Sequence, residues 1–238
     1  MKTVLFDLDG TLLPIDLETF ANVYIKELMK VCAPKLGCDG KAMAAALWEG
    51  TGHMLKNDGS MPNSERFWLH FTKALDVERE FAERITNEFY SNEFSVVKPL
   101  LRKTDLPARW IETLQDKGYN LILATNPLFP QAAIKARLDW MGIGMDSFQL
   151  ATRYDNSSFC KPNLDYYRET LEKTGYKPQD CLMVGNNMHE DMCAEKLGMD
   201  TYLITDFLEN PKDEDINAHK NGDYASFTAF VDSLPSMV

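Results

Sequence analysis

The chain has 238 residues and a formal net charge of −11, with 25 Lys and Arg against 36 Asp and Glu. Hydrophobic residues make up 45%, which is typical of a globular protein with a sizeable core and excludes a disordered chain. The acidic balance argues against binding to nucleic acids or to anionic membranes, because both require a basic face. A local site can still bind an anion, since it can oppose the global charge.

Cysteine content and apolar segments predict a cytoplasmic protein. The 5 cysteines are an odd number without a CxxC pair, so no disulfide framework is expected. No apolar run approaches the ~20 residues of a membrane helix. The first apolar run, residues 4–6, meets Asp7 too soon to be the core of a signal peptide.

The N-terminal part of the chain is predicted to form one strand and then a block of helices. Residues 2–8 are an apolar run too short for a helix, which predicts a buried strand that ends in a turn. Apolar residues over 17–29 then recur at steps of three and four, which is typical of an amphipathic helix. Further helices are predicted over 40–55, 64–75 and 78–89. Residues 15–98 are therefore expected to be nearly all helical.

Strands and helices alternate in the remainder of the chain. Apolar runs predict strands over 119–124, 148–151, 181–184 and 201–204. Helices are predicted over 107–117, 131–141, 164–173, 190–197 and, after a charged loop at 209–215, 227–234. Such alternation predicts an α/β fold with a parallel sheet and helices on both faces. The helical block is then an insertion between the first two strands of this sheet.

Four short segments carry polar residues that could meet at one edge of the sheet. Three of them follow predicted strands, and the fourth lies in the loop before a helix. They are Asp7-Leu8-Asp9-Gly10-Thr11, Thr125-Asn126, Gly185-Asn186 followed by Glu190 and Asp191, and Cys160-Lys161-Pro162. Because ligands of open α/β sheets bind at the carboxyl ends of strands, we expect the four segments to converge there.

The residue types in these segments suit the transfer of a phosphoryl group. One of the carboxylates of Asp7 and Asp9 could attack phosphorus and form an aspartyl-phosphate. The other could protonate the leaving group and then activate water. Gly10 permits close approach of the backbone. The hydroxyl of Thr125, with the backbone N–H of its neighbour, could hold a phosphoryl oxygen.

The same segments offer a cation and a set of metal ligands. Lys161 supplies a compact positive charge against a phosphoryl group in transfer. Mg²⁺ prefers a few carboxylate oxygens together with water and phosphate. The residues that could supply such oxygens are Asp7, Asn186, Glu190 and Asp191.

In order and spacing, the segments resemble the four motifs of the haloacid dehalogenase superfamily. The matching residues are Asp7-Leu8-Asp9-Gly10-Thr11-Leu12, Leu123-Ala124-Thr125-Asn126, Lys161-Pro162 and Val184-Gly185-Asn186-x-x-x-x-Asp191. The resemblance spans the chain and implies a Rossmann-like core of residues 1–14 and 99–238. It also implies an α-helical cap domain, residues 15–98, inserted after the first motif.

The resemblance to the phosphatase branch of this superfamily implies a role for each matched residue. Asp7 corresponds to the nucleophile and Asp9 to the general acid/base, while Lys161 stabilises the phosphoryl group. The residues expected to bind substrate are Gly10, Thr11, Thr125 and Asn126. The residues expected at the Mg²⁺ ion are Asp7, Asp9, Asn186, Glu190 and Asp191.

One position departs from the family pattern. Where the family usually has an aspartate that binds the metal, this chain has Asn186. An amide oxygen can coordinate a hard cation, but it contributes no charge. Asn186 could instead cap the helix predicted to follow it, and either Glu190 or Asp191 could restore the charge.

The sequence therefore predicts a Mg²⁺-dependent phosphoric monoester hydrolase that acts on a small phosphorylated metabolite. A phosphosugar mutase of the same superfamily is an alternative. A metal-independent dehalogenase is another, although the first motif of the dehalogenase branch lacks the second acid, Asp9. A third alternative, suggested by Asn186, is a non-catalytic phosphate- or partner-binding protein with a weakened metal site.

Two groups of residues outside the motifs are interpreted as structural. The histidines show no spacing typical of metal ligands, and they are His53, His70, His189 and His219. Aromatic residues of the helical block recur at helical spacing, so most are expected in the core, while one or two could face the substrate. They are Trp48, Phe67, Trp68 and Phe71.

Overall fold

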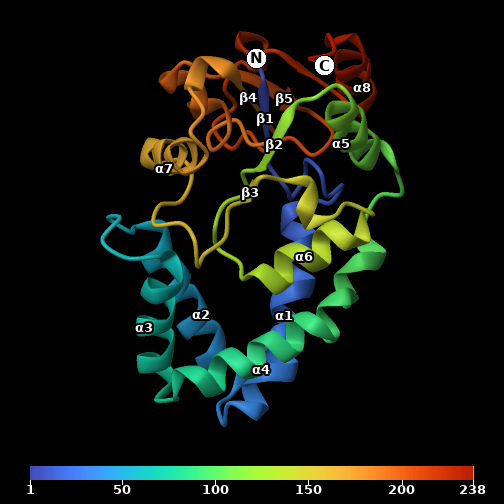
Figure 1. The fold of residues 1–238 in the computed structure, drawn as a ribbon. Helices are drawn as coiled ribbons and strands as arrows, with labels where there is room; N and C mark the ends of the chain where they lie inside the picture. The colour runs from blue at the N-terminus through green and yellow to red at the C-terminus, as the bar shows by residue number, and fades with distance from the viewer. Residues whose placement is uncertain (238) are drawn as a thin grey trace.

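The computed structural model describes residues 1–237 and contains a six-stranded sheet whose neighbouring strands are all parallel (Figure 1). The strands are β1 (Thr3–Phe6), β2 (Asn120–Leu123), β3 (Leu150–Ala151), β4 (Cys181–Gly185), β5 (Asp200–Ile204) and β6 (Asn221–Gly222). Their order is β3-β2-β1-β4-β5-β6, so β1 lies between β2 and β4. The predicted α/β fold with a parallel sheet is confirmed.

Helices α1 to α7 lie between strands in the sequence, and α8 follows the last strand. Between β1 and β2 lie α1 (Leu17–Lys35), α2 (Gly40–Leu55), α3 (Asn63–Leu75), α4 (Arg79–Ser91), the 3-10 helix η1 (Glu93–Leu100) and α5 (Leu106–Asp116). After β2 come α6 (Gln131–Trp140), α7 (Leu164–Thr174) and α8 (Tyr224–Ser233). Shorter 3-10 helices are η2 (Met145–Ser147), η3 (Pro178–Asp180), η4 (Met192–Leu197) and η5 (Ile216–Ala218).

The first strand is buried on both faces. Successive side chains of a strand point to opposite faces of the sheet. Val4 and Phe6 belong to a hydrophobic cluster that contains residues of α5 and α8. Leu5 belongs to a second cluster with residues of α7. Helices therefore cover both faces, which explains why this strand is an unbroken apolar run in the sequence.

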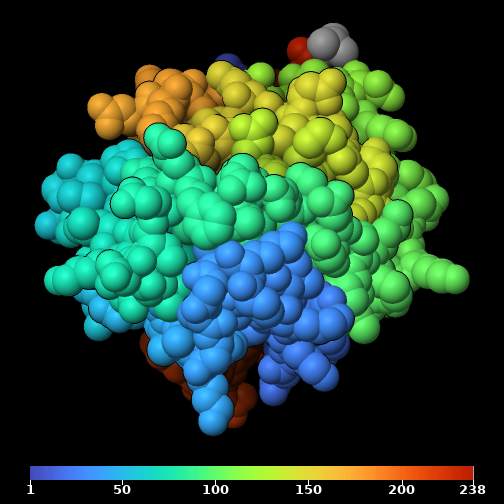
Figure 2. All heavy atoms as spheres, turned by 90° about the horizontal axis from the view of Figure 1, so that it is seen from below, coloured from blue at the N-terminus to red at the C-terminus, as the bar shows by residue number. Residues whose placement is uncertain are grey.

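Helices α1 to α4 lie together beyond the carboxyl ends of the strands, and we call them the helical layer (Figure 1). Along α1 the buried residues Phe20, Tyr24 and Leu28 follow the helical period. Helix α6 packs against α4 and η1, so the layer contacts the part of the chain that follows β2. The helical layer makes up most of the surface seen from below (Figure 2). Among the described residues, no helix combines the length and the apolar character needed to cross a bilayer.

One predicted element differs in the structure, and the structure contains one strand that the sequence did not predict. The predicted α-helix over 190–197 is a turn held by the side chain of Asn187, followed by the 3-10 helix η4, which ends at Gly198 in the left-handed region (φ +87°). Strand β6 pairs with β5 although it has only two residues, which leaves no pattern to recognise in the sequence.

Candidate active site

A tight turn after β1 brings two carboxylates to the carboxyl edge of the sheet. The backbone N–H of Asp7 donates to the carbonyl of Val184 (2.9 Å), which ties Asp7 to the end of β4. The chain then turns back, as the N–H of Leu13 donates to the carbonyl of Leu8 (2.7 Å). Asp9 lies within this turn, so both carboxylates reach one cavity.

Asp7 and Asp191 share one buried ammonium group. Nζ of Lys161 donates to Oδ1 of Asp7 (2.9 Å) and to Oδ1 of Asp191 (2.6 Å). The side chain of Lys161 is fully buried, so water screens these ion pairs little. Burial lowers the pKa of the Lys161 ammonium, but Asp191 and Asp7 outweigh burial and hold this pKa well above its usual value. Lys161 is therefore a permanent cation beside Asp7.

The carboxyl group of Asp7 has an unusually high proton affinity. Burial raises the pKa of Asp7 to about 8; Lys161 opposes the rise, while Asp191 and Asp9 add to it. Shifts of this kind are typical of groups arranged for reaction. Further positive charge in the cavity would favour the ionised, nucleophilic form of Asp7.

Arg137, which belongs to none of the four motifs, holds the second carboxylate. Its Nη1 donates to Oδ2 of Asp9 (2.5 Å), and its guanidinium lies over the ring of Phe129, 4.2 Å from the centroid. Oδ1 of Asp9 and Nη2 of Arg137 are buried without a hydrogen-bond partner among the described residues. Arg137 shares the buried face of α6 with Ile134 and Leu138. An arginine on the apolar face of a predicted helix is the signal that could have identified it.

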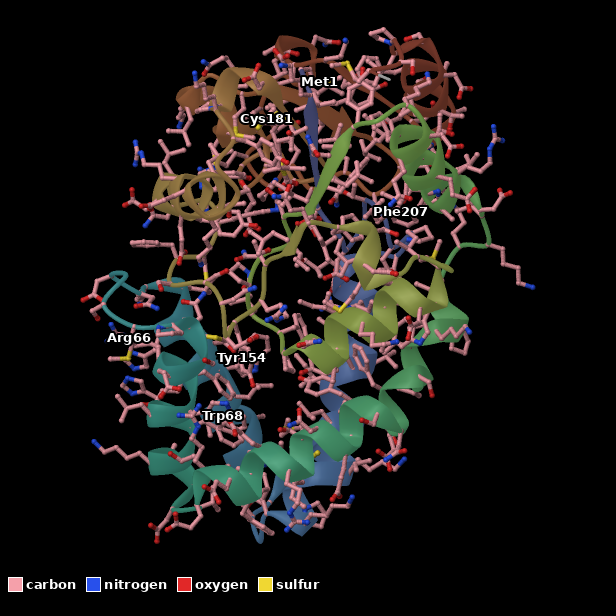
Figure 3. All side chains as sticks on the ribbon, in the orientation of Figure 1. Met1, Arg66, Trp68, Tyr154, Cys181 and Phe207 are labelled. Atoms are coloured by element: carbon pink, nitrogen blue, oxygen red, sulfur yellow. The ribbon has the colours of Figure 1, made fainter. Side chains whose placement is uncertain are left out.

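Asn186 is fixed between two backbone segments. Its Oδ1 accepts from the hydroxyl of Thr11 (3.1 Å), and its Nδ2 donates to the carbonyl of Phe207 (2.6 Å), a residue marked in Figure 3. It also packs on Gly10, which has a φ of +84° and whose Cβ, if present, would lie 2.2 Å from Nδ2 of Asn186. Position 10 therefore requires glycine.

The turn after β4 is capped by Asn187 rather than by Asn186. Oδ1 of Asn187 accepts from the backbone N–H groups of His189 (2.9 Å) and Glu190 (2.8 Å). Its Nδ2 donates to Oε2 of Glu209 (2.6 Å). Of the two interpretations of Asn186, the helix cap is thus wrong, and the metal ligand stays a prediction.

Two further carboxylates face the cavity. Glu190 accepts from Nδ2 of Asn126 (3.0 Å), and burial, the largest cause, raises the pKa of Glu190 to about 7. Glu209 is half-buried, and burial raises its pKa as well. Glu209 begins the charged loop predicted after the last recognised strand, and its backbone reaches the site by pairing in parallel with Asn187. No motif in the sequence marks this carboxylate.

These side chains line a cavity of about 150 Å³ at the carboxyl edge of the sheet. Its walls contain most of the predicted site residues, namely Asp7, Asp9, Thr125, Asn126, Asn186, Glu190 and Asp191. Gly10, Thr11 and Lys161 are not part of these walls. Gly10 and Thr11 support Asn186 instead, and Lys161 acts on the cavity through Asp7 and Asp191.

The chemistry of the cavity fits a hard divalent cation. Carboxylates and an amide oxygen are ligands that Mg²⁺ prefers. In the described part of the chain, the cations Lys161 and Arg137 form ion pairs with only three of the five carboxylates at this cavity. The five are Asp7, Asp9, Glu190, Asp191 and Glu209. Extra positive charge would satisfy the unpaired Oδ1 of Asp9 and offset the repulsion between these acids and a phosphate group.

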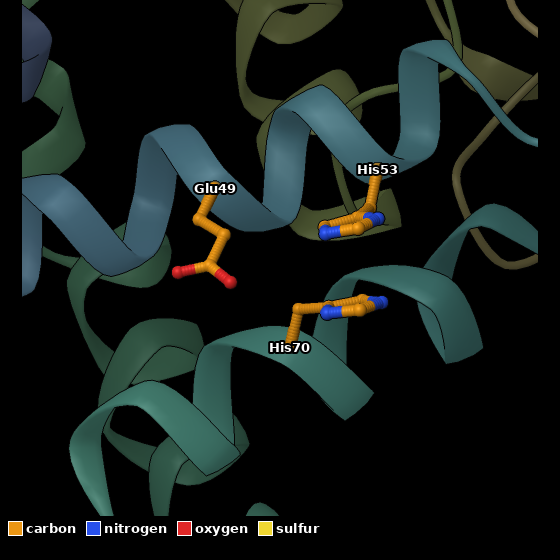
Figure 4. Close-up of side chains that lie close together, drawn as sticks. All are labelled: Glu49, His53 and His70. Carbon is orange, nitrogen blue, oxygen red and sulfur yellow. The ribbon is translucent and has the colours of Figure 1, made fainter.

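Three potential metal ligands also lie together on the helical layer, although the sequence shows no ligand spacing there. Glu49 and His53 lie one turn apart on α2, and His70 faces them from α3 (Figure 4). One ligand atom from each lies within 4.8 Å of the others. The two imidazole rings stack, with centroids 3.3 Å apart, and burial and His53 lower the pKa of His70. None of these residues lines the cavity at the carboxyl edge of the sheet.

The chain is similar to proteins of known activity over most of its length. It is 26% identical over 227 residues to a glyceraldehyde 3-phosphate phosphatase of Methanothermobacter thermautotrophicus, covering 93% of this chain and 92% of the relative. It is 23% identical to the pyrophosphatase PpaX of Halalkalibacterium halodurans, covering 86% and 83%. The solved structure of a HAD phosphatase from Thermococcus onnurineus has the same fold, with a TM-score of 0.59, 21% identity and full coverage of both chains.

The family assignment rests on a match that includes all four motifs. A model of the haloacid dehalogenase-like hydrolases matches residues 1–198. This range runs from the first strand through η4 and contains the parallel strands β1 to β4. The chain therefore belongs to the family of haloacid dehalogenase-like hydrolases.

Proposed function

We propose that this hydrolase is a Mg²⁺-dependent phosphatase that cleaves a small phosphate monoester through an aspartyl-phosphate. The observation that carries the proposal is the placement of Asp7 in the cavity wall, with its Oδ1 held by the buried ammonium of Lys161. One oxygen is thereby oriented, and the other is left to attack phosphorus. The names of the two curated relatives, both phosphatases, support the same reaction class.

In the proposed first step, a carboxylate oxygen of Asp7 forms a bond to phosphorus while the bond from phosphorus to the ester oxygen breaks. Asp9 gives its proton to the departing alkoxide, so the products are an alcohol and the phosphorylated enzyme. Arg137 holds Oδ2 of Asp9 and so fixes the orientation of the carboxyl group that transfers the proton. In the second step, Asp9 takes a proton from water, which then displaces phosphate from Asp7.

Other residues of the cavity orient the phosphoryl group. Thr125 lies in the wall directly after β2, where its hydroxyl can donate to a phosphoryl oxygen. Asn126 links two parts of the site, since its Oδ1 accepts from the N–H of Lys161 (3.2 Å) and its Nδ2 donates to Glu190. When bound by Asp7, Asp9, Asn186, Glu190 and Asp191, Mg²⁺ would supply charge that offsets the phosphate oxygens.

The helical layer has a proposed role as well. We propose that residues 15–98 act as a cap domain over a core of residues 1–14 and 99–238. The support is that Leu17 of α1 lies in the wall of the catalytic cavity next to Leu128 and Phe129. A cap in this position would shield the reaction from water. Location in the cytoplasm stays a prediction.

Hydrolysis of p-nitrophenyl phosphate tests the proposal. Purified protein should release nitrophenol and phosphate in stoichiometric amounts with Mg²⁺, and EDTA should abolish the release. Quenching in acid during turnover should trap a phosphoprotein that the Asp7→Asn variant does not form. Turnover that is unaffected by EDTA, or no turnover of any phosphate ester, would overturn the assignment.

A further inference from the structure

A second cavity, of about 240 Å³, adjoins the catalytic one. It lies between the helical layer and the loop after β2, and it shares three wall residues with the catalytic cavity. The shared residues are Leu17, Leu128 and Phe129. A group bonded to a phosphate at Asp7 could therefore extend past these side chains into the second cavity.

The second cavity is lined by apolar and aromatic side chains, and none of the described wall residues is charged. Its most prominent polar groups already have partners within the protein. The hydroxyls of Tyr24 and Tyr90 are 2.6 Å apart, and Nε1 of Trp68 donates to the hydroxyl of Tyr154 (3.4 Å). Trp68 and Tyr154 face each other between α3 and the loop after β3 (Figure 3).

This lining selects against polar leaving groups. A sugar hydroxyl that enters the cavity loses its hydrogen bonds with water. It gains contacts with apolar side chains and with tyrosine hydroxyls that already have a hydrogen-bond partner. A second phosphate group would be buried without a cation. An apolar group gains free energy in proportion to the surface it removes from water. The cavity is therefore suited to hydrocarbon, in contrast to the polar substrates named for the two relatives.

We infer that the substrate is a phosphate monoester of an apolar alcohol, whose hydrocarbon group occupies the second cavity. This inference rests on the proposed phosphatase function. A cavity of ~150 Å³ accepts benzene, so by simple scaling this one accepts roughly ten carbon atoms. Aryl, arylalkyl and medium-chain alkyl phosphates fall within that limit.

A series of alkyl phosphates of increasing length measures how long a hydrocarbon chain the cavity accepts. With Mg²⁺ present, kcat/KM should rise roughly fourfold per methylene from ethyl to octyl phosphate, the factor that corresponds to burial of one CH₂. It should stop rising near decyl phosphate, where the cavity is full. Glycerol 1-phosphate, glyceraldehyde 3-phosphate and pyrophosphate should be poorer than hexyl phosphate. Equal rates along the series, or preference for a polar substrate, would overturn the inference while leaving the phosphatase function intact.

Variants at Ala21 shorten the cavity. Ala21 lies on the face of α1 that lines it, and Ala21→Leu and Ala21→Phe add side chains of increasing size. The chain length at which kcat/KM stops rising should shorten by roughly three carbons with Leu and further with Phe. Ala45→Phe places the same ring on the exposed surface of α2 and should keep the wild-type limit. An unchanged limit in a folded Ala21 variant would contradict the inference. The Leu variant, a smaller change, serves if the Phe variant does not fold.

Binding provides a readout that does not depend on turnover. Trp48 and Trp68 line the cavity, so tryptophan fluorescence should respond to hexylphosphonate, which cannot be hydrolysed. Hexylphosphonate should bind at least tenfold more tightly than methylphosphonate in the presence of Mg²⁺, and Ala21→Phe should remove the difference. If no ester is hydrolysed but this difference is found, the phosphatase function fails and the apolar cavity stands. Equal affinities for the two phosphonates would refute the cavity assignment.

Discussion

Asp7 is the residue on which the proposed chemistry depends, since Lys161 orients its carboxylate at the cavity wall. In Asp7→Asn the shape is kept, but an amide cannot form the acyl-phosphate, so turnover should fall by more than ~10³-fold. The measurement is kcat for p-nitrophenyl phosphate with Mg²⁺, with circular dichroism to confirm the fold. Wild-type turnover in a folded variant would show that another group is the nucleophile.

Arg137 leads to a prediction about stability. In Arg137→Met the carboxylate of Asp9 loses its partner in a buried setting, which should lower the free energy of unfolding by about 3–5 kcal/mol. Adding Asp9→Asn to this variant should recover part of the loss, because the unpaired charge is then absent. Urea unfolding of the two single variants and the double variant measures the coupling. Additive losses would mean that the two side chains do not interact energetically.

Single residues could be predicted where a local motif carries them. Four such residues lie within the short sequence motifs, and the structure brings them together as expected. They are Asp7, Asp9, Lys161 and Asp191. Glu209 could not be predicted, because its place depends on how the chain returns after β5. Position in space, and not residue type, distinguishes it from the other acids of its loop.

At the scale of elements, the loop after β5 places the carboxylate of Glu209 in the wall of the cavity that also contains Asn186, and we propose that it supplies the charge that Asn186 lacks. We expect Glu209→Gln to raise the Mg²⁺ concentration for half-saturation by roughly 10- to 100-fold, as for other groups that support a metal site. Glu214→Gln removes an exposed carboxylate from the same loop and serves as the control. The shift of the melting temperature with Mg²⁺ provides a readout besides activity. Identical titrations for both variants would exclude Glu209 from the metal site.

The contacts between this loop and the end of β4 also bear on Asn186→Asp. The substitution replaces an N–H donor by a negatively charged oxygen opposite the carbonyl of Phe207. In the absence of metal we expect a loss of about 1–3 kcal/mol in the free energy of unfolding. Saturating Mg²⁺ should recover more stability in the variant than in the wild type, if residue 186 is a ligand. Equal recovery in both proteins would leave Asn186 as a structural residue only.

The helices and strands that could be predicted are those with a long hydrophobic period or apolar run in the sequence. The long helices α1 to α4 and the buried strands β1, β2, β4 and β5 show clear periods or apolar runs, and they occur near the predicted positions. Strand β6 and helix η4 could not be predicted, because two residues carry no period and because the choice between α and 3-10 geometry depends on packing. Boundaries depend on caps, as at Asp223, whose side chain starts α8 at Tyr224.

For the whole molecule, the buried acids predict how stability depends on pH. The pKa values of Asp7 and Glu190 are raised to about 8 and about 7, so the folded chain binds these protons more tightly than the unfolded chain does. Their contribution to stability is present below pH ~4 and is lost as the pH rises through 7 to 8. The metal-free protein should therefore become less stable as the pH rises from ~4 to ~8. The Asp7→Asn variant should lose less stability over this range.

Thermal unfolding in EDTA at intervals from pH 5 to pH 8 tests this prediction. The quantity of interest is the difference between the wild type and Asp7→Asn, because other titrating groups are common to both. Mg²⁺ should restore stability more at pH 8 than at pH 5, since the cation binds the ionised carboxylates. Parallel pH profiles of the two proteins would contradict the raised pKa of Asp7.

The position of β1 inside the sheet has a consequence for how the chain is made. Thr3 pairs with Asn120 on one side and with Cys181 on the other, so β1 is synthesised well before either of the strands that pair with it. The helical layer has mostly local contacts and can fold while β1 still lacks a neighbour. Until residue 185 emerges, at least one edge of this apolar strand is open to other chains. Nascent chains that stop before β4 should therefore aggregate or recruit chaperones, whereas chains extending past β5 should not.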